Sequence, residues 1–150
     1  MSLGNRTVIV TGAAGNLGKA VAKAFSDLGA NLVLVDLKRE ILEGAFGSEN
    51  DHRVFVPANL LDMAGAAGVA QAALARFGRI DVLCNIAGGF RMGETVHETS
   101  DENWNFLFDI NTRTLLHAVR AVVPHMVAAG GGKIVNVGAF AAQKGVAQLC

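Results

Sequence analysis

The sequence predicts an α/β fold in three layers: a doubly wound parallel sheet of about five strands with helices on both faces. Three observations lead to this prediction. Short apolar runs rich in β-branched residues alternate with longer segments whose apolar residues recur at helical spacing. The short runs are almost continuously apolar, which is typical of parallel strands buried on both faces. No linker or low-complexity tract interrupts the chain, so we expect one domain over residues 1–150.

The elements follow in order along the chain. Strands are predicted over residues 6–12, 31–36, 52–60, 80–88 and 133–137. Helices are predicted over residues 16–30, 37–48, 62–78 and 101–132. Gly29 and Gly78 fit the C-terminal stops of the first and third helices.

The last predicted helix is long and has one polar residue on its apolar face. Thr99 or Ser100 is expected to cap it, with Thr99 and Glu102 in a capping box, and Pro124 is expected to kink it or begin a new turn. The apolar stripe comprises Trp104, Leu107, Phe108, Leu115, Val119 and Val122. Asn111 falls on this stripe. Neighbouring backbone could satisfy its amide, but a place at the carboxyl edge of the sheet favours a role in a site.

The composition argues against several classes of protein. With 13 Lys+Arg and 13 Asp+Glu the formal net charge is zero, and no basic patch points to nucleic acid. No apolar run is long enough to span a membrane, so we expect no membrane partner. Cys84 and Cys150 lack metal-ligand spacing, which favours reduced thiols and a cytoplasmic protein. We interpret His97, His117 and His125 as surface or interface imidazoles and predict no metal site.

A glycine-rich loop joins the first predicted strand to the first helix. Gly12 permits a tight turn, Gly15 leaves room for a pyrophosphate, and Gly18 lets the helix pack closely on the strand. The start of the helix, at Asn16 and Leu17, offers free N–H groups and partial positive charge to phosphates. A plain strand–helix turn would not require three glycines at this spacing. The sequence therefore predicts a dinucleotide site of the Rossmann type.

Asp36 and Leu37 follow about twenty residues later, at the end of the second predicted strand. A carboxylate at this position can accept hydrogen bonds from both ribose hydroxyls and would repel a 2′-phosphate, which favours NAD over NADP. Lys38 and Arg39 come next, and either could turn toward a phosphate. Asp36 could also cap the helix that follows, and the two roles can coexist.

These motifs resemble, in order, those of the short-chain dehydrogenase/reductase family, and the resemblance covers essentially the whole chain. TGAAGNLG is similar to the family's cofactor loop, TGxxxGxG. The three glycines are spaced as in the family's extended, epimerase-like branch, and we expect Asn16 to take a left-handed conformation that closes the loop. ANL matches the segment that reaches the adenine in the family, with Asn59 in place of the usual acid and Leu60 after it.

NIAG is similar to the family's NNAG motif, with Ile86 in place of the second asparagine. This match implies that Asn85, Ala87 and Gly88 belong to the cofactor site. Asn111, in FDINTRT, matches an asparagine that helps to hold a water in the family's proton relay. GGKIVNV resembles the strand that leads to the family's active site.

The resemblance implies NAD(P)-dependent hydride transfer on a small alcohol or carbonyl substrate. In the family a tyrosine, assisted by a lysine four residues later, exchanges the proton, and a serine steadies the substrate oxygen. The chain has no tyrosine, and Gly138 and Ala139 occupy the expected serine position. We therefore expect a chain truncated before its acid–base residues, which binds dinucleotide weakly and turns over nothing, with Lys144 a solvated loop residue. The alternatives are a non-enzymatic dinucleotide-binding or interaction module and an epimerase-like enzyme.

The long helix has further apolar residues, Phe106 and Ile110, away from its main stripe. In the family this helix pairs with its counterpart in another subunit, which implies a homo-oligomer through residues 100–129. The long loop before the helix leaves the carboxyl end of a strand, where ligands bind in such sheets. Its Arg91 and Met92 are therefore candidates for contact with substrate.

Overall fold

The computed structural model describes residues 2–144. Its strands are β1 (Thr7–Thr11), β2 (Asn31–Asp36), β3 (Arg53–Pro57), β4 (Val82–Asn85) and β5 (Lys133–Asn136). Its α-helices are α1 (Asn16–Asp27), α2 (Arg39–Phe46), α3 (Met63–Phe77), α4 (Asp101–Phe108) and α5 (Thr114–Ala128). Shorter helical segments are η1 (Val96–Glu98), the π-helical η2 (Asp109–Arg113) and η3 (Phe140–Gln143). Each predicted strand and helix is present, with shorter bounds.

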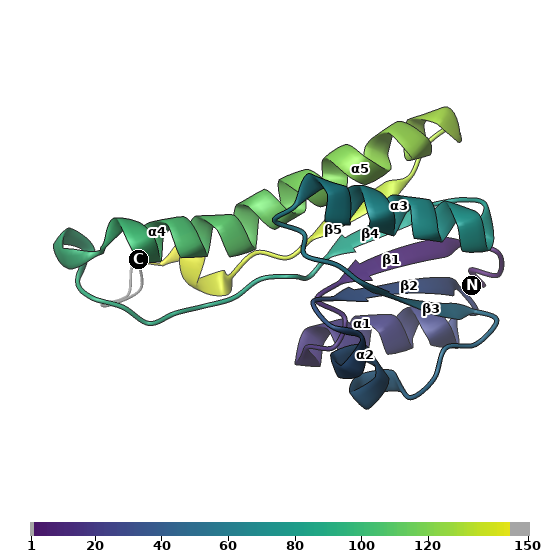
Figure 1. The fold of residues 1–150 in the computed structure, drawn as a ribbon, viewed down its shortest axis with the longest axis horizontal. Helices are drawn as coiled ribbons and strands as arrows, with labels where there is room; N and C mark the ends of the chain where they lie inside the picture. The colour runs from purple at the N-terminus through teal and green to yellow at the C-terminus, as the bar shows by residue number, and fades with distance from the viewer. Residues whose placement is uncertain (1, 145–150) are drawn as a thin grey trace.

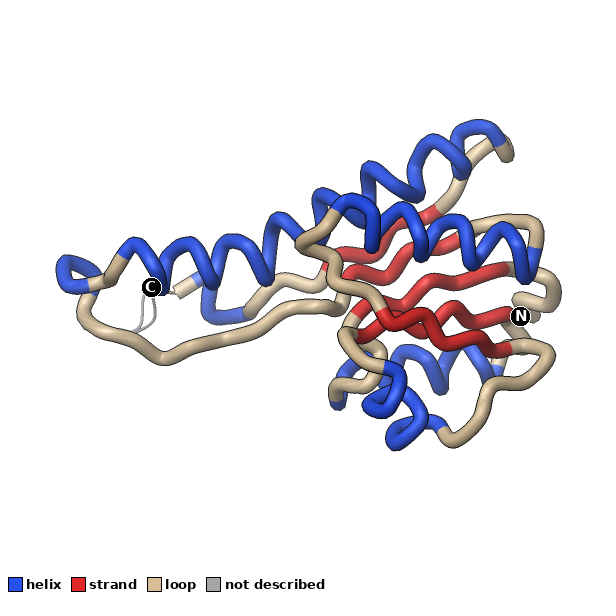
Figure 2. Tube along the Cα trace, in the orientation of Figure 1, coloured by secondary structure: helices blue, strands red, loops and turns tan. Residues whose placement is uncertain are grey.

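The five strands form one parallel sheet in the order β3-β2-β1-β4-β5. Helices α3 and α5 cover one face and α1 and α2 the other, which confirms the predicted doubly wound fold (Figure 1). Figure 2 shows the same sheet in red between its helical layers. The strand order reverses between β1 and β4, and in such sheets ligands bind outside the carboxyl ends of the strands at that point.

The sheet separates two apolar cores. One lies under α3 and α5 and includes Val122, and the other lies under α1 and α2 and includes Leu42. Strand β1 serves both cores, because Ile9 belongs to the first and its neighbours Val8 and Val10 to the second. Alternation of this kind follows from the two-residue period of a strand. Because both faces of β1 are buried, its sequence is continuously apolar from Val8 to Val10.

A buried carboxylate joins two strands at their N-terminal ends, the end of the sheet opposite the predicted site. Asp81, just before β4, accepts hydrogen bonds from the Thr7 N–H at 2.9 Å, from Arg6 at 2.6 Å and from Arg79 at 2.6 and 2.7 Å. Burial alone would raise the pKa of the Asp81 carboxyl, but the hydrogen bonds from Arg79, Thr7 and Arg6 outweigh it and lower that pKa to about 2. The carboxylate therefore stays charged and joins β1 to β4.

Of the two residues predicted to cap the long helix, Ser100 is confirmed, whereas the Thr99–Glu102 capping box is wrong. Ser100 caps α4, because its Oγ accepts a hydrogen bond from the Asn103 N–H at 3.2 Å. Thr99 instead donates its hydroxyl proton to the carbonyl of Thr95 at 3.3 Å. The chain therefore enters the helix one residue later than the Thr99–Glu102 pattern indicates.

The helix changes geometry at η2. Segment η2 is a π-helical turn between α4 and α5. Helix α5 continues through Pro124 to Ala128, so Pro124 does not end the helix, and the expected kink there stays a prediction. The π-turn inserts an extra residue into the helical repeat, which rotates α4 relative to α5.

The predicted apolar stripe is only partly buried. The buried residues of α5 are Thr114, Ala118, Val122 and Met126, four residues apart. Trp104 and Phe108 on α4 are 58% and 48% exposed, so their expected burial is wrong. Helix α4 projects beyond the end of the sheet and has no sheet beneath it (Figure 1).

Strand β5 forms an edge of the sheet, and all four of its residues are exposed. Ile134 and Val135 are 40% and 46% exposed, which is unusual for β-branched residues of a parallel strand. Among residues 2–144, no helix is both long and apolar enough to cross a membrane.

Candidate dinucleotide-binding site

The chain turns sharply where β1 ends. Gly12 has a φ of 60°, a conformation that disfavours other residues, and a Cβ there would lie 2.8 Å from the Cα of Ala87. The Gly15 N–H donates to the Gly12 carbonyl at 3.2 Å and closes the bend. The Ala13 N–H donates to the Val35 carbonyl at 3.0 Å and joins the bend to β2.

Helix α1 starts directly over this bend. A Cβ on Gly18 would overlap the Gly12 carbonyl oxygen and lie 2.7 Å from the Ala13 Cα, so only glycine allows this packing. Gly15, the N-cap residue, has a φ of −68° that any residue can adopt. Gly15 therefore matters because it has no side chain, which leaves space in front of the first turn of the helix.

The first turn of α1 is available to an anion. In the described structure no side chain caps it, and it contains no acidic residue. The N–H groups at the start of a helix then have no intrahelical partner and carry partial positive charge. Asn16 is the first helical residue, so its expected left-handed conformation is wrong. The loop closes through Gly12 instead.

Asp36 lies at the end of β2 beside the bend. Its Oδ2 accepts the Ala14 N–H at 3.1 Å and its Oδ1 accepts the Leu37 N–H at 2.9 Å. The carboxylate therefore fixes the glycine bend and still has free lone pairs on the cavity side. Lys38, not Asp36, is the N-cap residue of α2, so the alternative role as a helix cap is not observed.

The segment after β4 is held by a buried hydroxyl. Thr11 Oγ1 accepts the N–H groups of Ile86 and Ala87 at 3.0 and 3.1 Å and donates to the Cys84 carbonyl at 3.4 Å. Thr11 thus joins the end of β1 to the NIAG segment. Sequence reasoning missed it, although a threonine ending a buried strand before a glycine turn is a usable signal.

Asn111 joins the π-turn to the same segment. Its Oδ1 accepts the Gly89 N–H at 3.0 Å, and its Nδ2 donates to the carbonyls of Gly89 and Leu107, both at 2.9 Å. A Cβ on Gly88 would lie 2.7 Å from this Oδ1. The partners are backbone groups, as in the simpler of the two interpretations, and the water-holding role stays a prediction.

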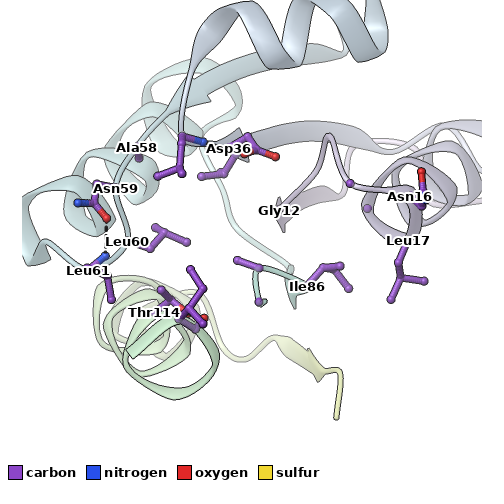
Figure 3. A pocket seen from close by; sticks show the side chains of 17 residues that line it. Gly12, Asn16, Leu17, Asp36, Ala58, Asn59, Leu60, Leu61, Ile86 and Thr114 are labelled. Atoms are coloured by element: carbon purple, nitrogen blue, oxygen red, sulfur yellow. Dashed lines mark hydrogen bonds between the residues drawn. The ribbon is translucent and has the colours of Figure 1, made fainter. Parts of the chain in front are cut away.

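A cavity of about 360 Å³ lies between these elements (Figure 3). All predicted cofactor residues except Asn85 line it: Gly12, Gly15, Asn16, Leu17, Gly18, Asp36, Leu37, Asn59, Leu60, Ala87 and Gly88. Asn85 is buried behind the cavity and donates its Nδ2 proton to Asn136 Oδ1 at 2.9 Å. Asn111 also lies outside the lining. The structure therefore brings the glycine loop, Asp36 and the ANL segment to one space.

The lining includes residues that the sequence did not assign to the cofactor site. They are Val35, Ala58, Leu61, Ile86, Ile110 and Thr114. Thr114 is buried, and its hydroxyl donates to the Ile110 carbonyl at 2.8 Å across the π-turn. Ile110 lies in the π-turn and Thr114 begins α5, and the two are four residues apart, the spacing of the buried residues that follow along α5.

Asn59 and Leu60 form the far end of the cavity, away from α1 (Figure 3). Asn59 Oδ1 accepts the Leu61 N–H at 3.0 Å, so the free group of this amide is its Nδ2. Leu60 is 6% exposed, and its carbonyl lies 2.9 Å from His117 Nδ1. His117 therefore holds this segment from α5 through that contact.

Cys84 is buried in β4 and lies outside the cavity lining. Burial raises the pKa of the Cys84 thiol to about 11, so it stays protonated. Cys150 lies outside the described residues. Within residues 2–144, no group of three His, Cys, Asp or Glu side chains is placed to hold a metal ion.

Comparison with known proteins agrees with this geometry. The family model described as short chain dehydrogenase matches residues 6–150. The 2,3-dihydro-2,3-dihydroxybenzoate dehydrogenase of Bacillus subtilis is 35% identical over 140 residues, covering 91% of this chain and 53% of that protein. The D-threitol dehydrogenase of Mycolicibacterium smegmatis is 37% identical over 144 residues, covering 93% of this chain and 55% of that protein. The chain spans about half the length of these curated relatives.

Solved structures agree as well. A metagenomic short-chain oxidoreductase in complex with NADP superposes with a TM-score of 0.86 at 31% identity, covering 99% of this chain and 69% of that one. A short-chain dehydrogenase/reductase from Brucella melitensis, described as a glucose/ribitol dehydrogenase, superposes with a TM-score of 0.86 at 31% identity, covering 97% of this chain and 62% of that one. The sheet order, the glycine bend and these matches together show that the chain belongs to the short-chain dehydrogenase/reductase family.

Proposed function

We propose that this chain is the dinucleotide-binding part of an NAD-dependent oxidoreductase that acts on a small alcohol or carbonyl compound. The cavity is the observation that carries the proposal. It is lined in turn by an uncapped helix start, the Asp36 carboxylate and the Asn59 amide, the order in which a dinucleotide presents its diphosphate, ribose and adenine. The bound nicotinamide supplies hydride chemistry, and the residues described here bind and orient the cofactor.

Three features of the chain fit the dinucleotide. The first-turn N–H groups of α1 would hold the diphosphate in the space that Gly15 leaves open. Asp36 lines the cavity and would accept the adenosine ribose hydroxyls. Asn59 Nδ2 would donate to the adenine edge, between the apolar side chains of Leu37 and Leu60.

NAD is favoured over NADP by the charges around the ribose position. The Asp36 carboxylate would repel a 2′-phosphate. Arg39 forms ion pairs with Glu43 at 3.4 Å and Glu49 at 3.3 Å, which hold its guanidinium on the α2 side. Lys38 is exposed at the start of α2 and does not line the cavity.

The 150-residue chain is proposed to bind cofactor without turnover. It contains no tyrosine, and exposed Gly138 and Ala139 follow β5 where a serine is expected. The acid–base step of the reaction therefore has no phenol to carry it within these residues. Oxidation of NADH by the purified chain above background, with a range of small ketones, would contradict this proposal. The cytoplasmic setting and the substrate class of the whole protein stay predictions.

A homo-oligomer through α4 and α5 is proposed from the exposed apolar side chains there. Trp104 and Phe108 lie on one face of α4, around a hollow of about 190 Å³ that Leu107 and Thr112 also line. An exposed face of this kind indicates a protein–protein contact. Analytical ultracentrifugation of the chain should show an oligomer that Trp104→Ser weakens. A monomer at high concentration would contradict it.

Calorimetry with NADH and NADPH tests the cofactor assignment. The chain should bind NADH at least about tenfold more tightly than NADPH, a difference of about 1.4 kcal/mol. Asp36→Asn should weaken NADH binding and reduce the preference for NADH over NADPH, because the amide removes the charge and keeps only one of the two oxygens that accept the Ala14 and Leu37 N–H groups. Asp51→Asn is the matched control, since its side chain is exposed and lies outside the cavity lining. Equal or tighter binding of NADPH by the unaltered chain would refute the assignment.

A further inference from the structure

The far end of the cavity includes residues 58–61, which belong to no strand or helix. Outside regular secondary structure, backbone groups need individual partners, and those partners decide where the segment lies. One partner belongs to the sheet, because the Ala58 N–H donates to the Asp36 carbonyl at the end of β2 at 2.9 Å. Two further contacts attach the segment to helices α3 and α5.

Helix α3 contacts the segment through a glycine. The Asn59 carbonyl accepts the N–H of Asp62, the N-cap residue of α3, at 3.1 Å. Gly65 packs on the same carbonyl, and a Cβ there would overlap its oxygen and lie 3.3 Å from its carbon. A Cβ on Gly68, in the same helix, would have no neighbour within 4 Å. Of these two glycines, Gly65 is therefore the one whose missing side chain lets α3 lie against Asn59.

Helix α5 holds the next residue through a side chain. The Leu60 carbonyl lies 2.9 Å from His117 Nδ1 in a partly buried contact. A carbonyl oxygen can only accept, so Nδ1 carries the proton and donates it. Loss of this donor would leave the carbonyl without its partner, and the segment would move to satisfy it.

The two helices form one support for the segment. They share an apolar core that includes Val69 of α3 and Val122 of α5. The two attachment points are therefore fixed relative to each other. Neither Gly65 nor His117 lines the cavity, so each would act on a bound cofactor only through residues 58–61.

The support acts on one end of the cavity. Asn59 and Leu60 are the residues proposed to receive adenine, whereas the start of α1, proposed for the diphosphate, lies at the opposite end (Figure 3). Displacement of Asn59 and Leu60 should therefore change the binding of the base and leave the phosphate end as it is.

We infer that Gly65 and His117 are positioning residues for the adenine group of the cofactor. They hold residues 58–61 from α3 and α5 and thereby set the affinity for the adenine half of the dinucleotide. This inference rests on the proposed function, because it requires adenine at this end of the cavity.

The test compares a ligand that contains adenine with one that does not. AMP has the base, the ribose and one phosphate, whereas inorganic pyrophosphate presents the phosphate end alone. Each is titrated into the 15N-labelled chain, and its dissociation constant is taken from the shift of the Gly15 amide. The variants are Gly65→Ala and His117→Leu. Gly68→Ala adds the same methyl group in open space, and His117→Asn keeps an N–H donor on the atom next to Cγ.

Gly65→Ala and His117→Leu should each weaken AMP binding about tenfold, the loss expected when one hydrogen bond to the base is broken. Pyrophosphate binding should stay unchanged in both. Gly68→Ala should bind both ligands as the unaltered chain does, and His117→Asn should recover most of the AMP affinity. Unchanged amide shifts of Gly12 and Gly15 in the free variants check that the fold and the phosphate end are retained.

The inference would be overturned by unchanged AMP affinity in either variant, or by the same loss in Gly68→Ala as in Gly65→Ala. Equal loss of AMP and pyrophosphate affinity would also overturn it, because the two residues would then have only a structural role. NADH fluorescence with the unaltered chain separates the two proposals. Absence of NADH binding refutes the proposed function, whereas NADH binding with AMP affinity that the variants do not change refutes only the positioning role.

Discussion

The buried hydroxyl of Thr11 provides a test of how the cavity is built. Thr11 is 1% exposed, and its Oγ1 is the acceptor for the N–H groups of Ile86 and Ala87. Thr11→Val keeps the shape of the side chain and removes the acceptor. Thr11→Ser keeps the acceptor and removes one methyl group. The pair therefore separates hydrogen bonding from packing.

The structure sets the size of each effect. A buried amide that loses its acceptor costs about 1–3 kcal/mol. The two amides are only partly buried, so we expect about 2 kcal/mol for both in Thr11→Val. The serine variant loses a fully buried methyl group, at about 1 kcal/mol. The valine variant should thus be the less stable by about 1 kcal/mol, the reverse of the order that apolar burial alone gives.

Urea unfolding followed by far-UV circular dichroism measures this difference. NADH affinity is the second readout, because Ile86, Ala87 and Gly88 line the cavity and should shift when their anchor is lost. Thr11→Val should therefore bind NADH more weakly than Thr11→Ser. The reasoning would be refuted by a valine variant as stable as the unaltered chain, or by equal loss of affinity in both variants.

Two further predictions concern the bend and the opposite edge of the sheet. Gly18→Ala should destabilise the chain by about 1–2 kcal/mol and weaken NADH binding, because the new Cβ would overlap backbone atoms. Gly44→Ala in α2, with open space around it, should instead stabilise by about 0.5–1 kcal/mol in the same urea assay. The pKa of Asp81 is about 2 in the folded chain and about 3.9 when unfolded. Its carboxylate therefore contributes about 2 kcal/mol above pH 5, which is lost as the pH falls toward 2. Asp81→Asn should lower stability at pH 7 and flatten the acid dependence of the unfolding free energy, and an unchanged acid dependence would contradict this assignment.

The parts of the fold that follow from local chemistry were predictable. The strands, the helix stops at Gly29 and Gly78, and the bend at Gly12 depend on backbone angles and on side-chain alternation within a few residues. Asp36 was found for the same reason, because it follows a buried strand at a fixed distance from the bend. These features need no knowledge of distant neighbours.

The errors arise where distant neighbours decide. A helical stripe including Trp104 and Phe108 is visible in the sequence, but α4 has no sheet beneath it, so the stripe is exposed. Ile110 was placed away from the main apolar stripe, but it lines the cavity four residues before the buried Thr114. Asn16 was assigned a left-handed turn by its residue type, although Gly12 already supplies the positive φ.

Amide NMR of the 15N-labelled chain during an NADH titration tests the central claim most directly. We predict saturable shifts of the Gly15, Asn16 and Leu17 amides, together with those of Ala14 and Leu37, whose N–H groups donate to Asp36. Inorganic phosphate, which has no ribose for Asp36 to bind, should shift the helix-start amides alone. Saturable NADH binding that leaves these amides unshifted and moves signals elsewhere would contradict the account.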